Sequence, residues 1–216
     1  MSPAVRLPRP LVTAGALVFL LAAGLVLLTI VRPSSASPSA GSGTSAAAPA
    51  EDSADVGFAR DMSVHHQQAV EMAFVVRDRT TDEGVRRLAY DIINTQANQR
   101  GMMLGWLESW GRPKSSERAP MEWMGHPVTA DDGSLMPGMA TDTELDALRA
   151  AEGRDAEVRF LRLMTVHHRA GADMARAAAA SAGTDEIRNL AAGMARAQDS
   201  EISLMADMLE ARGARP

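Results

Sequence analysis

The chain combines one uncharged apolar run near its start with segments in which apolar residues return every three or four positions. Residues 11–31 are mostly Leu, Val and Ala and carry no charge. Farther on, positions 62, 65, 66, 69 and 72 share one helical face, because side chains three and four residues apart are neighbours on a helix. This pattern and its flanking turn residues predict helices over about residues 55–78, 82–110, 141–151, 154–181 and 185–212.

Turn residues mark where these helices begin and end. Thr80 and Glu83 have the Thr-x-x-Glu spacing of a capping box, which predicts a helix cap at Thr80. Thr184 can cap the helix that starts after the second turn. Gly111 and Gly213 stand where a C-terminal glycine stop is expected. Each half of the chain is therefore expected to contain two helices joined by a short turn.

The chain matches itself when it is shifted by 102 positions. Residues 58–111 align with residues 160–213 without a gap, and the identical positions include Phe, Met, His and Gly. The match predicts an internal repeat in which each copy is a helical hairpin. The crossover over residues 112–153 is long enough to cross a bundle. We therefore expect an all-α fold, a ferritin-like four-helix bundle over residues 55–213 made of two duplicated helical hairpins.

Residues 1–32 are predicted to form a membrane anchor. With a rise of about 1.5 Å per residue, a helix over residues 11–31 can cross a hydrocarbon core of about 30 Å. Arg6 and Arg9 precede the run and Arg32 follows it. The larger positive charge before the run predicts an N-terminus inside the cell. We expect a single-pass protein of the cell membrane whose helical part lies outside.

A cleaved signal peptide is the alternative to the transmembrane anchor. Processing near Ser34-Ser35-Ala36 would release a secreted, extracellular protein. The apolar run is longer than the roughly 7–15 residues of a signal core, which favours retention. Residues 33–54 are rich in Pro, Ser, Ala and Gly and are predicted to be a flexible linker.

The composition excludes several classes of protein. Of the 216 residues, 14 are Met, only 4% are aromatic and none is Cys. Helices are therefore favoured over a sheet, and disulfides, thiolate ligands and a lipoprotein cysteine are excluded. From Glu51 onward the chain holds 27 acidic and 19 basic residues. An acidic exported part of this kind is not expected to bind nucleic acid, and it attracts cations weakly.

The chain has two histidine pairs, and each pair has one methionine three residues before it and another six residues after it. This repeated set of Met and His, here called the frame, is the main candidate for a functional site. The two pairs contain four of the chain's five histidines. A single buried histidine or methionine is usually a core residue, but core packing needs only apolar volume, which Leu supplies as well as Met. The recurrence of the whole frame therefore favours metal binding. The predicted metal ligands are Met62, His65, His66, Met72, Met164, His167, His168 and Met174.

The donor types in this frame favour a soft metal ion. Met62 and Met164 stand three residues before a histidine, where the Glu-x-x-His motif of di-iron bundles would place a glutamate. A thioether in place of a carboxylate points away from iron. We expect copper, as Cu(I), whereas zinc could bind at the histidines alone.

Further side chains are predicted to support the metal or to bind a second ion. Ligand histidines usually donate their free ring N–H to an acceptor, and an ordinary polar patch between helices is the alternative role for such acceptors. The candidate supporting residues are Glu71, Asp173, Gln96, Gln198 and Glu201. In the crossover, methionines near the fifth histidine predict a second metal site, unless they only fold the crossover onto the bundle. Its candidate ligands are Met121, Met124, His126, Met136 and Met139.

These motifs resemble those of the family called domain of unknown function 305. The resemblance rests on Phe-x-x-x-Met-x-x-His-His-x-x-x-x-x-Met twice, on Met-Pro-Gly-Met between the copies and on Gln-x-x-Glu-Ile-x-x-x-Met near the end. It covers about residues 55–213 and implies a ferritin-like bundle, often exported, with some copper-binding members and the same eight ligands. Gln99 departs from the family pattern, which usually has Glu there, as at Glu201. Weaker or different binding is therefore expected in the first copy.

The leading hypothesis is an exported protein that binds Cu(I) for copper sequestration or transfer. One alternative is a dinuclear metal oxidase or reductase of ferritin-like type, which needs carboxylates from several helices near the histidines. The other is a non-metal helical interaction domain whose histidines are structural or sense pH. No catalytic residues are predicted, and a binding protein is expected rather than an enzyme. The sequence allows a homo-oligomer and does not identify a partner for copper delivery.

Overall fold

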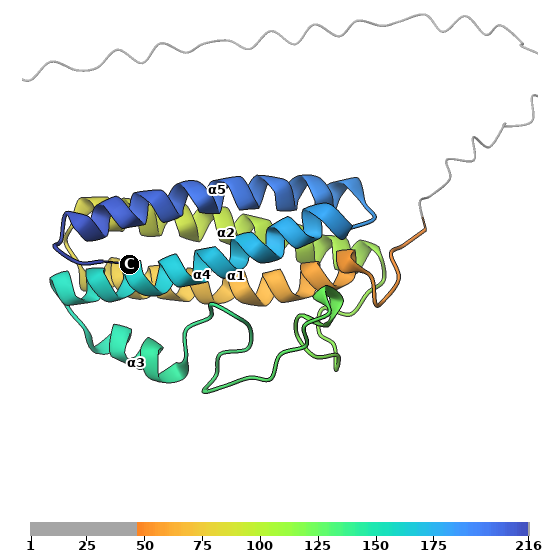
Figure 1. The fold of residues 1–216 in the computed structure, drawn as a ribbon, viewed down its shortest axis with the longest axis horizontal. Helices are drawn as coiled ribbons and strands as arrows, with labels where there is room; N and C mark the ends of the chain where they lie inside the picture. The colour runs from red at the N-terminus through yellow and green to blue at the C-terminus, as the bar shows by residue number, and fades with distance from the viewer. Residues whose placement is uncertain (1–46, 216) are drawn as a thin grey trace, which may run out of the picture. The chain divides into compact units, whose positions relative to one another are not determined.

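The computed structural model describes residues 47–215, which form an all-helical fold (Figure 1). This part of the chain contains five α-helices, one short 3-10 turn and no strand. None of these helices is long and apolar enough to span a membrane. The predicted anchor over residues 11–31 and most of the predicted linker over residues 33–54 lie outside the described residues.

Four long helices make up the body of this fold, and a short helix lies in the connection between the second and third of them (Figure 1). The predicted all-α class is confirmed. Each helix begins and ends within two residues of its prediction. The helices are α1 (Ala54–Arg79), α2 (Glu83–Ser109), α3 (Asp142–Ala150), α4 (Gly153–Ser181) and α5 (Asp185–Glu210), and the 3-10 turn is η1 (Glu122–Met124).

Side-chain caps determine where three of the long helices begin. Ser53, Asp82 and Thr184 each accept a hydrogen bond from the backbone N–H three residues farther on. Each bond satisfies a donor that has no partner inside the helix. The predicted cap at Thr80 is wrong, because the Asp82 carboxylate accepts from the Val85 N–H at 2.8 Å and caps α2 itself. Thr80 instead ends α1.

The long helices pair as two hairpins that meet through α1 and α4. α1 packs along α2, and α4 packs along α5. α1 and α4 run in opposite directions (Figure 1). The early part of α1 therefore lies beside the late part of α4, and the apolar faces of all four helices form two buried clusters, one toward each end of the bundle.

The two clusters differ in composition. The methionine cluster lies where α1 begins and α4 ends, and its buried methionines are Met62, Met103, Met121, Met136, Met174 and Met194. The leucine cluster lies at the other end, and its buried leucines and methionines are Met72, Leu88, Leu145, Leu148, Leu161, Met164, Met205 and Leu209. Burial of apolar surface, at about 25 cal/mol per Å², supplies the main force that holds the hairpins together.

The crossover between the hairpins is held on α1 and α4 by specific contacts. Gln68 on α1 donates to the Ala140 carbonyl at 2.8 Å and accepts from the Ala140 N–H at 2.7 Å. Gly138 has a φ of +79° and lies so close to α4 that a Cβ would stand 2.9 Å from the Val166 carbonyl oxygen. Only glycine fits this position, because both the backbone conformation and the space exclude a side chain.

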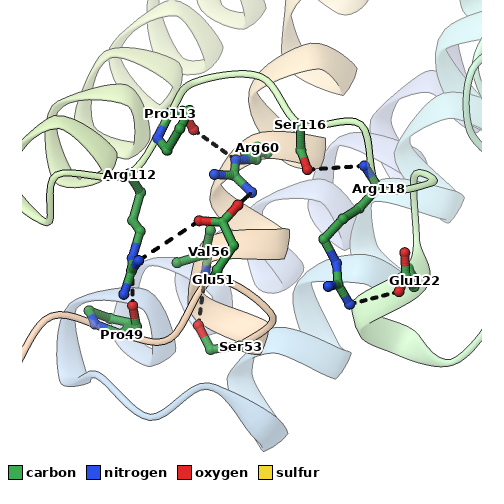
Figure 2. Close-up of polar contacts among 10 residues, drawn as sticks. All are labelled: Pro49, Glu51, Ser53, Val56, Arg60, Arg112, Pro113, Ser116, Arg118 and Glu122. Atoms are coloured by element: carbon green, nitrogen blue, oxygen red, sulfur yellow. Dashed lines mark hydrogen bonds and ion pairs between the residues drawn. The ribbon is translucent and has the colours of Figure 1, made fainter.

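Two arginines hold the segment before α1 against the start of the crossover (Figure 2). Arg60 donates to the Pro113 carbonyl at 2.8 Å and pairs with Glu51 at 2.5 Å. Arg112 donates to the Pro49 carbonyl at 2.8 Å. The beginning of the described chain and the beginning of the crossover therefore lie at the methionine end of the bundle.

Candidate metal centre

The four paired histidines lie together inside the bundle, between the two apolar clusters. Their side chains are at most 1% exposed. The rings of His65 and His167 stack with their centroids 3.7 Å apart, and the centroid of His168 is 6.2 Å from that of His167. Sequence alone left open which histidine of each pair faces inward. Both do, because neighbouring helices and the crossover cover two sides of α1 and of α4.

The second histidine of each pair bonds to a side chain on the other helix of its own hairpin. His66 Nε2 lies 2.9 Å from Gln99 Oε1, and His168 Nε2 lies 2.5 Å from Glu201 Oε2. Because these oxygens accept, Nε2 carries the hydrogen and Nδ1 keeps a lone pair in the neutral ring. In both rings Nδ1 is buried and has no hydrogen-bond partner among the described residues.

The first histidine of each pair contacts the other hairpin. His167 Nε2 donates to the backbone carbonyl of His65 at 3.0 Å. Both ring nitrogens of His65 are buried and make no hydrogen bond of regular geometry among residues 47–215, although the Pro137 backbone interacts with the ring. A buried polar atom without a partner costs about 1–3 kcal/mol. These nitrogens are therefore candidate ligand atoms.

Burial favours the neutral form of His65, His66 and His167. Loss of hydration, with a smaller contribution from nearby imidazoles, lowers the pKa of His65 to about 3 and the pKa of His66 to about 4. At His66 the hydrogen bond to Gln99 offsets part of this decrease. The pKa of His167 is also well below its usual value, mainly through lost hydration. Neutral imidazole is the form that binds a metal ion.

The four predicted thioether ligands lie in the clusters on either side of the imidazoles. Met62 and Met174 belong to the methionine cluster, and Met72 and Met164 belong to the leucine cluster. All four are at most 1% exposed. Since α1 and α4 run in opposite directions, each cluster receives one of these methionines from each hairpin. The methionines that flank one histidine pair in the sequence therefore lie in different clusters, each beside a methionine of the other hairpin.

Two predicted supporting residues, Gln96 and Gln198, are buried at equivalent places on α2 and α5. The side-chain oxygen of each has no partner among the described residues. Gly171 on α4 makes room for one of them, because a Cβ there would stand 2.6 Å from Gln198 Oε1 and 3.2 Å from His65 Cε1. Nothing in the sequence pattern pointed to Gly171, whereas Gln99 shares a helical face with Gln96 in the sequence pattern and also departs from the family pattern.

Of the three acidic residues predicted to support the histidines, Glu201 bonds to His168, whereas the other two form ion pairs with arginines. Glu71 pairs with Arg149, and Asp173 pairs with Arg176. Within residues 47–215, no three His, Asp or Glu side chains are grouped so that they could hold a metal ion. A metal ion in this centre would need the thioethers as well as the imidazoles. Neutral nitrogen and sulfur donors of this kind suit a soft ion.

The five predicted ligands of the crossover extend from the core to the surface. Met121 and Met136 are buried in the methionine cluster, at 5% and 2% exposure. Met124 and Met139 are half-buried and pack against the same cluster. His126 is exposed. These residues therefore lie at different depths at one end of the bundle.

Several solved structures are similar to this chain. A DUF305 protein from Streptomyces coelicolor, described as secreted, is 58% identical, with a TM-score of 0.72 over 77% of this chain and 98% of that chain. A DUF305 fragment from Deinococcus radiodurans is 30% identical, with a TM-score of 0.60 over 72% of this chain and 94% of that chain. CopM in its Cu(I)-bound form is 26% identical, with a TM-score of 0.53 over 72% of this chain and 95% of that chain.

CopM is also solved in Cu(II)-bound and Ag-bound forms. No curated protein matches the chain. The family model described as domain of unknown function (DUF305) matches residues 55–209, which are most of the described part. This match confirms the resemblance seen in the sequence motifs, and the chain belongs to the DUF305 family.

Proposed function

We propose that the protein binds Cu(I) in the centre formed by its paired histidines and flanking methionines, and that it sequesters the ion or passes it on. The observation that carries this proposal is the set of buried, unpartnered ring nitrogens on His65, His66 and His168. Their lone pairs and the four buried thioethers are neutral, soft donors in a place closed to water.

We assign the thioethers to two sides of one imidazole group. Met62 and Met174 serve on the side of the methionine cluster, and Met72 and Met164 serve on the side of the leucine cluster. The acceptors on α2 and α5 orient the rings and fix which nitrogen faces the metal. This assignment uses all eight ligands that the sequence pattern predicts.

The solved relatives support copper and export. CopM binds Cu(I), Cu(II) and silver, so a protein of similar fold holds a soft monovalent ion. The Streptomyces coelicolor relative is described as secreted. On this basis we propose that the helical part works outside the cell, with residues 11–31 as its membrane anchor or as a cleaved signal. We likewise propose that the bundle, with its single long crossover, is ferritin-like.

The alternatives have less support. A dinuclear oxidase or reductase would need several carboxylates beside the histidines, whereas in the described residues Glu201 alone pairs with one of them and no three His, Asp or Glu side chains are grouped to hold a metal ion. Zinc or iron would be coordinated by the imidazoles and only weakly by the thioethers. A role as a non-metal interaction domain leaves the buried, unpartnered nitrogens without an explanation.

The test is an anaerobic Cu(I) titration of the purified full chain against a competing chelator, with Zn(II) and Fe(II) in parallel. In the test variant all four paired histidines are changed to Ala. In the control variant the exposed residue Met102 is changed to Leu. We expect tight Cu(I) binding that the test variant loses and the control variant keeps.

Other outcomes would overturn the proposal in different ways. Zn(II) or Fe(II) binding without Cu(I) binding would reject copper. Undiminished Cu(I) binding by the four-histidine variant would reject the site. Circular dichroism checks the helix content of each variant. If the four-histidine variant has lost its helices, the single variants His66→Gln and His168→Gln take its place in the titration.

A further inference from the structure

The centre is closed to solvent, so a metal ion needs a route into it. The eight proposed ligands are at most 1% exposed. The two ends of the bundle differ in what covers them. At the leucine end the crossover contributes Ala140, Leu145 and Leu148 to the cluster and, within the described residues, no methionine. On the outside of that cluster a single methionine, Met208 of α5, packs half-buried among the described residues, and the crossover adds no donor to it.

At the methionine end, methionine side chains of the crossover cover the core. Four of its methionines either belong to the methionine cluster or pack against it, and they are Met121, Met124, Met136 and Met139. Met121 is 5% exposed and shares the cluster with Met62 and Met174. Thioethers therefore continue from the proposed ligands to the outside of the bundle.

A tight turn bonds the backbone of two residues with potential donor side chains, Met124 and His126, to Met121. The Met121 carbonyl accepts the N–H of Met124 at 3.0 Å and the N–H of His126 at 3.3 Å. The turn requires a left-handed backbone at Met121, whose φ is +66°. A non-glycine residue in this conformation is strained and persists only where its surroundings hold it. The fold thus maintains an unfavourable backbone that ties half-buried Met124 and exposed His126 to the main chain of a buried methionine.

Asp61 on α1 holds this turn in place. Its Oδ2 accepts the Met121 N–H at 2.8 Å and the Trp123 Nε1–H at 2.9 Å. Gly57, one helical turn earlier, makes room for the indole, because a Cβ there would stand 2.5 Å from it. Phe58 meets the indole edge to face, with centroids 5.9 Å apart. Three neighbouring residues of α1 are therefore shaped to dock one turn of the crossover.

The other hairpin lacks this docking place. The residues 102 positions after Gly57 and Asp61 are Arg159 and Leu163. Neither can offer the space or the acceptor that the turn uses. On the outer side, Arg118 and Glu122 form an ion pair at 2.7 Å that also holds the turn (Figure 2). The docked turn is a feature of the methionine end alone.

We infer that Met121, Met124 and His126 form a metal port, through which Cu(I) passes from the surface to the methionine cluster and the centre. The inference rests on the proposed function. Thioether and imidazole bind Cu(I) as neutral ligands. The ion can therefore pass from one donor to the next without a change of oxidation state and without release to water. Asp61 acts as a positioning residue that holds the Met121 turn on α1.

The test measures how fast the full chain takes Cu(I) from a coloured chelator complex, by stopped flow, together with its affinity at equilibrium. The port variant is Met121→Leu with Met124→Leu and His126→Ala. The matched control is Met102→Leu with Met208→Leu, outside the port. A third variant, Asp61→Leu, introduces the residue found at position 163, and Asp61→Asn keeps an acceptor oxygen.

We expect the port variant to take up Cu(I) about tenfold more slowly, with unchanged affinity in the centre. The control should match the wild type, Asp61→Leu should slow uptake, and Asp61→Asn should restore most of the rate. An unchanged rate in the port variant, or equal slowing in the control, would reject the port and leave the proposed function intact. Failure of the wild type to bind Cu(I) at equilibrium would reject both.

Discussion

The two hairpins hold their second histidine in the same geometry but with acceptors of different charge. His66 on α1 donates to the Gln99 amide at 2.9 Å, whereas His168 on α4 donates to the Glu201 carboxylate at 2.5 Å. In both hairpins the acceptor lies 33 residues after the histidine, on the next helix. Helix pairing therefore determines the geometry, while a single side chain determines the charge.

This difference bears directly on metal binding. A carboxylate acceptor makes its imidazole a stronger donor and places negative charge near a bound cation, and a neutral amide does neither. The centre is therefore asymmetric although its ligands repeat. Within the shared centre, His168 should bind copper more firmly than His66.

The largest expected effect is acid destabilisation of the metal-free protein. His65 and His66 have folded pKa values of about 3 and about 4, below the ordinary value near 6.5. Their contribution to stability is complete above pH 6.5 and declines as the pH falls toward these folded values. Each histidine should remove about 1.4 kcal/mol of unfolding free energy per pH unit in that window. Urea unfolding at pH 7, 6 and 5 measures the slope.

A histidine variant sharpens this measurement. Replacing His66 by Asn should make the slope between pH 6 and 5 shallower, because one fewer buried group takes up a proton on unfolding. A stability that stays constant from pH 7 to pH 5 would contradict the neutral, buried histidines.

Exchange of the acceptors tests the asymmetry itself. Glu201→Gln gives the second hairpin the acceptor of the first and should weaken Cu(I) binding about tenfold. Gln99→Glu makes the reverse change and should strengthen it. Chelator competition at pH 7 measures both affinities. Equal affinities in the two variants and the wild type would show that the charge of the acceptor does not matter.

Gly171 tests a second difference between the hairpins, since its counterpart in the first is Ala69. A methyl group at Gly171 would overlap the Gln198 side-chain oxygen and crowd the His65 ring. Overpacking outweighs the gain in helix propensity, so Gly171→Ala should cost a net of about 1 kcal/mol. The matched change Ala69→Gly should cost about 2 kcal/mol, through lost helix propensity and the loss of one buried methyl group. Only the first change should also disturb Cu(I) binding, which separates the two causes in a titration.

The smallest expected effect concerns the surface. Arg176 links α4 to α5 by pairing with Asp199 at 2.6 Å, and the equivalent residues in the first hairpin are Phe74 and Ala97. Exposed ion pairs contribute little to stability. Arg176→Phe should therefore shift Tm by about 2 °C or less and leave Cu(I) affinity unchanged. A larger shift would show that the ion pair sets the distance between the helices of that hairpin.

Much of the fold could be predicted from sequence because helices depend on local signals. The spacing of apolar residues and the turn residues located five helices to within two residues. The failure at Thr80 is also local, since two candidate caps stand two residues apart and Asp82 has the better placed oxygen. The site was predictable as a set of residue types, because the same frame of Met and His occurs twice in the chain.

By itself, the sequence determined the helices, the paired histidines and the supply of soft donors. Only the tertiary structure decided that both histidines of each pair are buried, that Met62 shares a cluster with Met174, and that Gln99 meets His66. It also decided that Met121 is buried while His126 is exposed. The physical reason is distance along the chain. Residues three or four apart are neighbours on any helix, whereas residues 33 or 112 apart meet only when the helices pack.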